Sequence, residues 1–306
     1  MFIGASGLKL RAYVGHGNAI PTGGGNSGLA AENYHGTTNV AGVVLTYPVI
    51  RSRQQTLNVY TSLDSLESNV RDNVPLVQAS DDALRVLRLG EDYAMSDLWL
   101  GTARPAANVV SVRLSQGLRI LGAESDGTAA DAARQRERSD FFKVNFEATR
   151  TQTLFSPFEG GSVALMGLLA GQWSENILPP AEQFYLGGSQ YTRGYYSGQI
   201  PGDKALVATV ELQFNTGTNL SMWGLSAEVS TQFYLFYDWG ETWQNESKDF
   251  ATVVNSAGGG VRMQVTRYTE VDFEALARFN RYPTGSGADI SAENGIGLYW
   301  HVLGHF

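Results

Sequence analysis

The stretch Gln183-Phe-Tyr-Leu-Gly-Gly-Ser-Gln-Tyr-Thr-Arg-Gly-Tyr-Tyr-Ser-Gly-Gln-Ile-Pro-Gly202 combines the composition of a loop with the side chains of a packed segment. Five glycines, a proline and two serines interrupt any regular pattern. Yet the stretch also carries several aromatic residues and one central cation, Arg193. Long loops that contain their own packing residues usually fold back on the protein or act as lids. The sequence therefore predicts a loop that packs onto the rest of the chain, with Arg193 at its centre.

Strands with alternating apolar and polar residues surround this loop. In the strand that follows it, Leu206, Ala208 and Val210 face one way, while Thr209 and Glu211 face the other. Helical periodicity is scarce. The sequence predicts about 12–14 strands of roughly 9–12 residues, the length that a tilted strand needs to cross a bilayer. The predicted strands are 7–14, 39–47, 54–64, 83–92, 96–102, 109–116, 141–149, 163–173, 205–214, 229–239, 259–268, 271–279 and 296–306.

The connections and the polar faces of these strands favour a membrane barrel. Short connections at 48–53 and 267–270 alternate with long polar ones at 15–38, 122–140 and 240–255. This rhythm is typical of outer-membrane barrels, in which polar residues face a wet interior. A soluble β-sandwich is the alternative, although its strands usually have only about 5–6 residues. The fold class predicted is all-β, an antiparallel transmembrane β-barrel.

The composition sets further bounds. The chain of 306 residues has a net charge of −8, 17% charged residues and no cysteine. The acidic balance argues against nucleic-acid binding. No apolar run reaches the roughly 18 residues of a membrane-spanning helix. The start, Met1-Phe-Ile-Gly4, lacks the basic and apolar regions of a secretory signal peptide. We expect residues 1–306 to form one barrel domain whose natural N-terminal part is missing.

Arg193 is the sharpest candidate site residue. An arginine inside a confined lumen needs a partner, because burying an unpaired charge is costly. The alternation of 229–239 places Asp238 on the polar face, and Glu211 has the same phase on the neighbouring strand. We expect Arg193 to bind Asp238, with Glu211 as a possible second acceptor. The alternatives are a solvated arginine in a turn and, for Glu211, an ordinary lumen-facing carboxylate.

Other motifs do not indicate catalysis or metal binding. His301 and His305 lie in a predicted strand, where four residues separate them by roughly 13 Å, too far to share a metal. The run 258–260 of three glycines lacks the strand–helix context and the lysine of a phosphate loop. We therefore expect no enzyme activity, no metal and no cofactor. The acid-bearing loop 240–246 leaves a surface enzyme at the barrel rim as an alternative.

Four segments together resemble a known family. They are Leu186-Gly-Gly-x-x-x-x-Arg-Gly-Tyr195, Phe236-x-Asp-x-Gly240, Thr46-Tyr-Pro-Val-Ile-Arg-Ser-Arg53 and Ser115-Gln-Gly-Leu-Arg-Ile-Leu-Gly-Ala123. They are similar to the outer-membrane transporters of two-partner secretion, the haemolysin secretion/activation proteins of the ShlB/FhaC/HecB type. These transporters belong to the Omp85 superfamily. The resemblance covers most of the chain.

The resemblance implies a 16-stranded barrel, preceded by two periplasmic POTRA domains, in the outer membrane of a Gram-negative bacterium. It implies export of one large haemolysin or adhesin, unfolded in transit, without ATP. Outer-membrane lipid, lipopolysaccharide and the barrel-assembly machinery are the other partners implied. The residues that match the family's loop and its anchor are Gly187, Gly188, Arg193, Gly194, Tyr195, Phe236, Asp238 and Gly240, and Glu211 joins them as the second acceptor expected from strand alternation. The end of the chain, with Trp300 and the terminal Phe306, resembles the signal that the assembly machinery recognises.

The front of the chain departs from the family pattern. Neither a POTRA sequence nor a signal peptide precedes Gly7, and 7–14 looks like roughly the fourth of the 16 strands. We therefore expect an incomplete barrel region. Two other functions stay open. One is a barrel-assembly insertase, which shares the loop signature. The other is a plain porin, which should lack the clasp between Arg193 and Asp238, or a rim-active enzyme, which should lose turnover when its loop acids are mutated.

Overall fold

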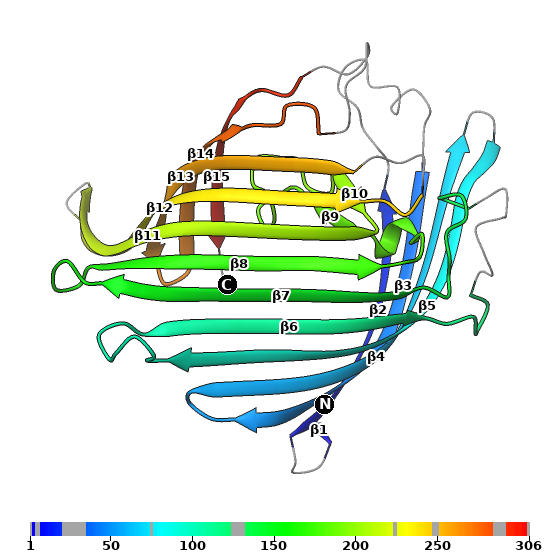
Figure 1. Cartoon of the computed structure of the whole chain (residues 1–306), viewed down its shortest axis with the longest axis horizontal. Coiled ribbons are helices and arrows are strands. Elements are labelled where there is room, and N and C mark those ends of the chain that lie inside the picture. Colours follow the sequence, from blue (N-terminus) through cyan, green and yellow to red (C-terminus); the bar gives the residue numbers. More distant parts are fainter. Residues whose placement is uncertain are drawn as a thin grey trace.

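The computed structural model is an all-β protein in which one large sheet curves around an inserted segment (Figure 1). It describes residues 2–3, 7–19, 35–73, 76–123, 132–222, 225–246, 251–283 and 292–304. The elements are β1 (Phe2–Ile3), β2 (Leu8–Ala19), β3 (His35–Arg51), β4 (Gln55–Asn73), β5 (Leu76–Asp97), β6 (Ala106–Gly117), β7 (Phe142–Phe155), β8 (Ser162–Ser174), the short 3-10 helix η1 (Pro180–Glu182), β9 (Phe184–Leu186), β10 (Ile200–Gly202), β11 (Lys204–Met222), β12 (Leu225–Trp243), β13 (Thr252–Thr266), β14 (Thr269–Arg278) and β15 (Ile296–Gly304).

The main sheet is a continuous antiparallel meander. Thirteen strands pair in the order in which they occur in the chain, β1 to β8 and then β11 to β15. Strands β9 and β10 form a separate two-stranded sheet inside the connection between β8 and β11. The predicted all-β antiparallel fold with 12–14 strands is therefore confirmed.

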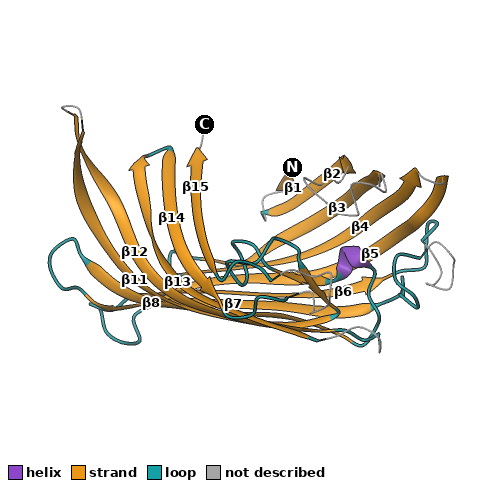
Figure 2. Cartoon of the chain, turned by 90° about the horizontal axis from the view of Figure 1, so that it is seen from above, coloured by secondary structure: helices purple, strands orange, loops and turns teal. Residues whose placement is uncertain are grey.

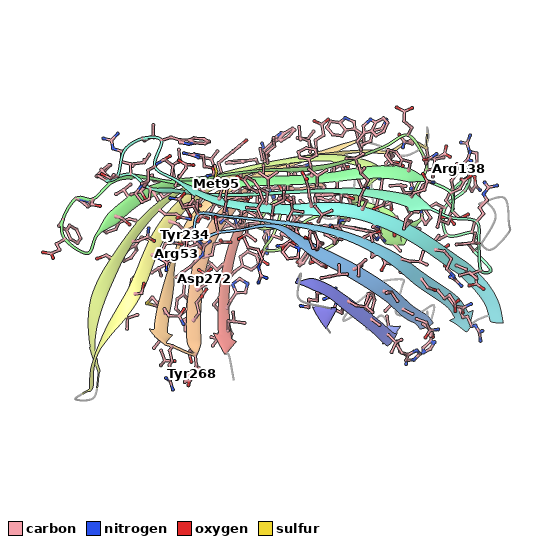
Figure 3. All side chains as sticks on the ribbon, turned by 90° about the horizontal axis from the view of Figure 1, so that it is seen from below. Arg53, Met95, Arg138, Tyr234, Tyr268 and Asp272 are labelled. Carbon is pink, nitrogen blue, oxygen red and sulfur yellow. The ribbon has the colours of Figure 1, made fainter. Side chains whose placement is uncertain are left out.

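The two faces of the sheet differ as the alternation predicts. On β12, the side chains of Phe233 and Leu235 are 48% and 64% exposed on the convex face. Their neighbours Tyr234, Phe236 and Asp238 are only 2%, 5% and 1% exposed and point to the concave face. Figure 3 shows side chains leaving both faces of the curved sheet. The convex face is therefore apolar, and the concave face holds the polar and charged side chains.

The strands have a long-loop end and a short-turn end. Because successive strands alternate in direction, the described residues of the connections 118–141, 175–203, 244–251 and 279–295 lie at the same end, which we call the long-loop end. The opposite, short-turn end holds tight connections such as the one between β13 and β14. In Figure 3, Arg138 marks the long-loop end and Tyr268 marks the short-turn end.

Pairs of a tyrosine and a glycine on neighbouring strands stabilise the curvature. Tyr60 of β4 lies opposite Gly90 of β5, and its ring covers that glycine so closely that a Cβ atom would lie 2.4 Å from ring carbon Cζ. Tyr13 of β2 covers Gly42 of β3 in the same way. Aromatic rings packed on cross-strand glycines are a recognised device for bending sheets.

Three details of the prediction are wrong. Several strands are longer than the expected length of roughly 9–12 residues, since β3, β4 and β5 have 17, 19 and 22 residues. The expected strand 96–102 does not exist, because β5 runs without a break from Leu76 to Asp97 and then turns. The turn contains Gly101 at φ 101°, and the Gly101 amide donates to the Leu98 carbonyl over 2.8 Å. The expected long loop 240–255 is shorter, since β12 extends to Trp243 and β13 begins at Thr252.

The curved sheet is an open trough when seen from above (Figure 2). Strands β1 and β15 are its edges, and no pairing between described residues joins them. Trp300, on β15, projects from the convex face and is 70% exposed, whereas Phe306 lies outside the described residues. Within the described ranges, no helix has the length and apolar character needed to cross a membrane.

Candidate functional site

The connection between β8 and β11, residues 175–203, lies on the concave face of the sheet (Figure 2). We call it the inserted loop. Its side chains Leu186, Tyr195 and Ile200 are buried in one apolar cluster with strand residues Val207 and Val254. The apolar residues that seemed excessive for a loop therefore pack against the strands behind them.

Glycines shape the inserted loop where its backbone turns most sharply. Gly187 has φ 100°, and a Cβ atom there would lie 2.0 Å from the Tyr196 carbonyl oxygen. Gly194 has φ 98° and passes so close to Leu276 of β14 that a Cβ atom would lie 2.6 Å from a Leu276 methyl group. Both conditions, a positive φ and a close approach, restrict these positions to glycine. Gly188 also has a positive φ.

The guanidinium of Arg193 is bound by two carboxylates. Its Nε and Nη2 donate to the two oxygens of Asp238, each over 2.9 Å, and Nη1 donates to Glu211 over 2.6 Å. The backbone amide of Arg193 also donates to Asp238 over 2.9 Å. The ring of Phe236 lies under the guanidinium, with its centroid 3.5 Å from Cζ. Asp238 and Glu211 are each 1% exposed, so this is a buried ion cluster with fork-like geometry.

The electrostatic environment keeps Arg193 charged. Burial by itself lowers the pKa of Arg193, but the hydrogen bonds and charges of Asp238 and Glu211 outweigh burial and raise the pKa above its ordinary value. A guanidinium cannot leave such a site by losing its proton. The loop can therefore be released from the strands only by breaking the ion pairs.

A second arginine shares the acceptor Glu211. Arg262 of β13 donates to Glu211 over 2.8 Å and lies over the ring of Tyr234, 3.8 Å from its centroid. Glu274 of β14 lies 3.8 Å from Arg193 Nη1. The network thus joins β11, β12, β13 and β14 to the tip of the loop. Removing any one member leaves a buried charge without its full set of partners.

The backbone on both sides of Arg193 is also bound. The Arg193 carbonyl accepts from the hydroxyl of Ser256 over 2.6 Å. The Gly194 carbonyl accepts from Arg278 and from the Tyr299 hydroxyl. The Tyr195 hydroxyl lies 2.8 Å from the Asn255 carbonyl and 3.0 Å from that of Asn280.

Gly240 allows the loop to approach β12. A Cβ atom at Gly240 would lie 2.6 Å from a methyl carbon of Thr192 and 3.0 Å from a Leu186 methyl. The structure therefore brings together the matched residues of the loop and of β12. Among the residues singled out from the sequence, Phe306 and His305 lie outside the described residues, and Trp300 lies on the convex face away from the loop.

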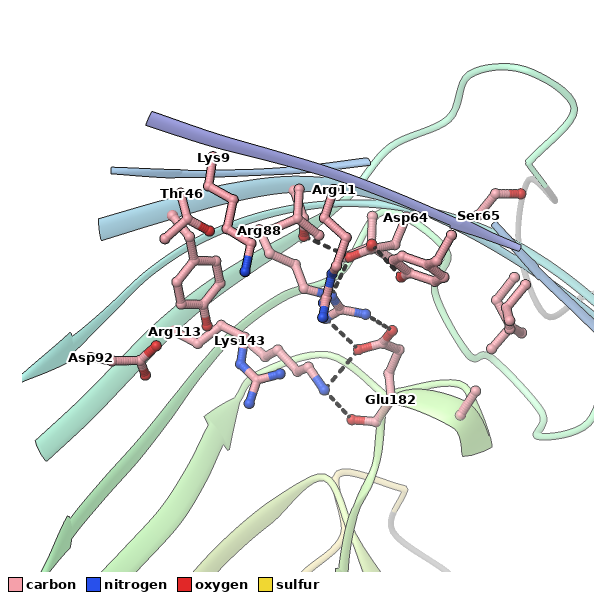
Figure 4. A pocket seen from close by; sticks show the side chains of 18 residues that line it. Lys9, Arg11, Thr46, Asp64, Ser65, Arg88, Asp92, Arg113, Lys143 and Glu182 are labelled. Atoms are coloured by element: carbon pink, nitrogen blue, oxygen red, sulfur yellow. Dashed lines mark hydrogen bonds and ion pairs between the residues drawn. The ribbon is translucent and has the colours of Figure 1, made fainter. Parts of the chain in front are cut away.

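A second anchor holds the start of the inserted loop. Glu182, in η1, is bound by Arg88 of β5 over 2.6 Å and by Lys143 of β7 over 2.8 Å (Figure 4). Arg88 also pairs with Asp64 of β4 over 2.9 Å. The sequence analysis missed this anchor. Alternation places Arg88 and Lys143 on polar faces, but only the strand register shows that both meet the same carboxylate.

A third anchor holds the end of the inserted loop. Asp203 is fully buried and pairs with Arg134, from the connection between β6 and β7, over 2.7 Å. It also accepts from the backbone amides of Leu178 and Asn245. The connection 122–140, predicted only to be long and polar, thus contributes Arg134, which links the inserted loop to the long-loop end. Within the described ranges, no group of three or more His, Cys, Asp or Glu residues is arranged to hold a metal ion.

Known proteins resemble the chain in sequence pattern and in fold. The model of a family described as haemolysin secretion/activation protein ShlB/FhaC/HecB matches residues 26–263. Comparison with curated proteins finds no match. Three solved structures have similar folds, as follows.

CdiB from Escherichia coli has a TM-score of 0.70 and 17% identity over 97% of this chain and 50% of its own. CdiB from Acinetobacter baumannii has a TM-score of 0.63 and 18% identity over 97% of this chain and 47% of its own. BamA from Haemophilus ducreyi lacking POTRA domains 1–3 has a TM-score of 0.61 and 14% identity over 97% of this chain and 59% of its own. The chain spans about half the length of the two CdiB chains. At these identities the likeness shows the fold, and it confirms the predicted barrel-type sheet.

Proposed function

Because the chain belongs to the haemolysin secretion/activation protein family, we propose that it forms the wall and the loop of a pore that exports a large partner protein. The family is one of outer-membrane β-barrels, and the chain is an outer-membrane protein. In the proposal, the concave face of the sheet is the lumen and the convex face meets lipid. The partner, of haemolysin or adhesin type, crosses unfolded and without ATP.

The observation that carries the proposal is the ion cluster around Arg193. A wide barrel needs a device that closes its interior when no partner is present, and the inserted loop lies on part of the concave face. Beside the apolar cluster of Leu186, Tyr195 and Ile200, the tip of the loop is held by charge, since Arg193 meets two carboxylates at 2.6–2.9 Å. Polar contacts of this kind can exchange with water and with a passing polypeptide. In the proposal, the loop can therefore move away from the strands while the sheet stays folded.

The fold alone does not separate export from barrel assembly, since BamA has a similar fold. The family match supports export, because it covers residues 26–263, including the segment 46–53 and the whole inserted loop. We therefore favour export.

The test compares Arg193→Ala and Arg193→Lys with the wild type. We expect both variants to reach the outer membrane in normal amounts, because the strand pairing does not depend on Arg193. Lysine keeps the charge but loses the two-point contact with Asp238, so the defect should be smaller in the lysine variant than in the alanine variant. Two readouts apply: the amount of partner protein in the medium and the conductance of the purified protein in a planar bilayer.

We expect the alanine variant to secrete less partner and to show a larger, noisier conductance, because the loop no longer stays on the wall. Arg267→Ala is the matched control, since Arg267 is exposed at the short-turn end and contacts only Tyr268 among the interactions of the described residues. Wild-type secretion together with wild-type conductance in Arg193→Ala would refute the proposed role of the loop.

A further inference from the structure

A group of cations lies on the concave face of β2–β7, away from Arg193. Five basic side chains line one cavity of about 650 Å³: Lys9, Arg11, Arg88, Arg113 and Lys143 (Figure 4). The carboxylates that line the same cavity are Asp64, Asp92 and Glu182. Five cations against three carboxylates leave a local charge of +2. This excess is notable in a chain whose net charge is −8.

Strand register arranges these cations in two rows across the sheet. The pairing through β3, β4 and β5 places Lys9 and Arg113 in one row, and Arg11, Arg88 and Lys143 in the next. Along each strand, side chains on the same face are two residues apart, so the two rows are separated by about 7 Å in the strand direction. The row of Arg11, Arg88 and Lys143 crosses five strand spacings from β2 to β7, about 24 Å, and the row of Lys9 and Arg113 crosses four, about 19 Å. We call the five residues the cation rows.

Part of the cation rows already binds a carboxylate. Glu182 is presented by the inserted loop, and its two oxygens lie 2.6 Å from Arg88 Nη2 and 2.8 Å from Lys143 Nζ. Arg88 Nη1 makes a further contact with Glu182 over 3.2 Å. The wall thus recognises an acidic side chain carried by a backbone segment that lies on the concave face.

The remaining three residues of the cation rows bind no carboxylate of the described residues. Lys9, Arg11 and Arg113 are exposed, and none of them forms an ion pair with a described residue. Arg11 only lies near the ring of Tyr13, with Cζ 5.9 Å from the centroid. Three cations therefore point into the cavity with their charges available to a ligand.

The opposite wall has the reverse charge. The cavity beside the tip of the inserted loop is lined by Glu270, Asp272 and Glu274 of β14, with Arg193 and Arg262 as its two arginines. Both arginines are already paired with carboxylates. A negatively charged ligand on the concave face is thus repelled from β14 and attracted to β2–β7.

We propose that the cation rows bind an extended, acidic stretch of polypeptide, held by its carboxylates as Glu182 is held. The inference rests on the proposed function in one respect, namely that this stretch belongs to the exported partner. A single phosphate would fill one contact and leave the others empty, because the available cations lie on β2 and β6. An extended chain that lies across β2–β7 meets the cations of one row at intervals of roughly 10–19 Å, and an acidic residue at every second position, about every 7 Å, places a carboxylate close to each of them.

Peptide binding tests the inference directly. The full chain is placed in lipid nanodiscs, and binding of a fluorescent peptide of roughly eight residues, enough to span the rows, is followed by anisotropy. Peptides of alternating Glu and Ser, Gln and Ser, or Lys and Ser are compared. The variant is Lys9→Gln, Arg11→Gln, Arg113→Gln. Its control is Arg53→Gln, Arg104→Gln, Arg267→Gln, which removes the same charge from exposed positions in the short turns.

We expect the glutamate peptide to bind the wild type at least tenfold more tightly than the glutamine peptide. The triple variant in the cation rows should lose on the order of tenfold in affinity, because each partly exposed pair contributes modestly. The control variant should keep the wild-type affinity. Equal binding of the glutamate and glutamine peptides, equal losses in the two triple variants, or displacement by millimolar inorganic phosphate would overturn the inference.

The outcome is independent of the pore function. If the peptide fails to bind while Arg193→Ala impairs secretion, only the acidic-stretch inference falls. If the peptide binds as expected while Arg193→Ala secretes normally, the cation rows stand as a binding site and the proposed role of the loop falls.

Discussion

At the scale of single residues, Arg193 differs from a surface arginine because both of its carboxylate partners are buried. Its fork-shaped guanidinium matches Asp238 at two points, and the remaining Nη1 reaches Glu211. The pairing of Arg193 with Asp238 follows from the sequence, since strand alternation places the aspartate on the polar face of β12. The pairing of Glu182 with Arg88 and Lys143 does not follow from it. That contact depends on how β5 and β7 are aligned, and 94 residues separate Arg88 from Glu182.

The prediction at this scale concerns Glu137. We expect the packing of the β6–β7 connection against the rest of the protein to depend on pH. Glu137 lies in the connection between β6 and β7 and accepts from the backbone amides of Ala133 and Arg134 over 3.1 and 3.2 Å. Burial, together with the charge of Asp82, raises the pKa of Glu137 from 4.5 to about 8. The folded state thus binds the proton more strongly than the unfolded state. The stability from this group is complete below pH 4.5 and is lost as the pH rises through about 8.

We therefore expect hydrogen exchange of the segment 132–140, corrected for the intrinsic rate, to become roughly fiftyfold less protected between pH 6 and pH 8. Glu137→Gln cannot ionise and should keep its protection over this range. Identical pH profiles for the wild type and the glutamine variant would show that Glu137 does not control the docking of this segment.

At the scale of elements, the inserted loop is fixed at its start, tip and end by different strands. Glu182 is held by β5 and β7, Arg193 by β11 and β12, and Asp203 by the β6–β7 connection. A loop that is bound at several points by ion pairs can break one of them while the others hold it in place. This arrangement agrees with a segment that shifts without leaving the concave face.

Strand positions follow from the sequence only where alternation is uninterrupted. The alternation of 205–214 and 229–239 predicts β11 and β12 because apolar side chains face outwards at every second position. The run Leu98-Trp-Leu100 misleads, because apolar residues at the short-turn end resemble a strand. These residues form a turn, and Trp99 is 73% exposed. The register, and with it the contacts between distant strands, cannot be derived from alternation, which is the same on every strand.

The tyrosine–glycine pairs give the element-scale prediction. A Cβ atom at Gly90 would lie 2.4 Å from the ring of Tyr60, so Gly90→Ala must displace the ring. We expect a loss of about 1–3 kcal/mol in the free energy of unfolding, as for other overpacked sites. The measurement is the urea midpoint of the protein in lipid vesicles.

Gly17→Ala is the matched control, because no atom lies within 4 Å of a Cβ at Gly17. Adding Tyr60→Leu to Gly90→Ala should restore part of the loss by making room. Equal midpoints for Gly90→Ala and Gly17→Ala would contradict this account of the curvature.

At the scale of the whole molecule, the two faces of the sheet require different surroundings. Leu212 lies on the convex face of β11, opposite Leu165 and Leu235, and is 43% exposed. Ser111 lies on the concave face of β6, opposite Asp92 and Glu147. A membrane protein should tolerate a new charge at the second position but not at the first.

We expect Leu212→Arg to destabilise the protein in lipid vesicles by about 2–4 kcal/mol, the cost of arginine near the middle of a lipid-facing strand. Ser111→Arg should change the free energy of unfolding by less than about 1 kcal/mol, because two carboxylates flank the site. The measurement is again the urea midpoint. Similar effects of both substitutions would mean that the convex face does not contact the hydrocarbon region.

The central claim is that the inserted loop lies on the concave face against β12. The chain has no cysteine, so an engineered pair is free of competing thiols. A Cβ atom at Gly240 would lie 2.6 Å from Thr192 Cγ2, so cysteine side chains at these two positions would be in direct contact when the loop is docked. We would measure disulfide formation in the folded double variant Thr192→Cys, Gly240→Cys by peptide mass spectrometry. The control is the double variant Thr192→Cys, Tyr237→Cys, whose second cysteine projects from the convex face. The account predicts a disulfide in the first pair and none in the control; no disulfide in the first pair under oxidising conditions, or equal yields in both, would contradict it.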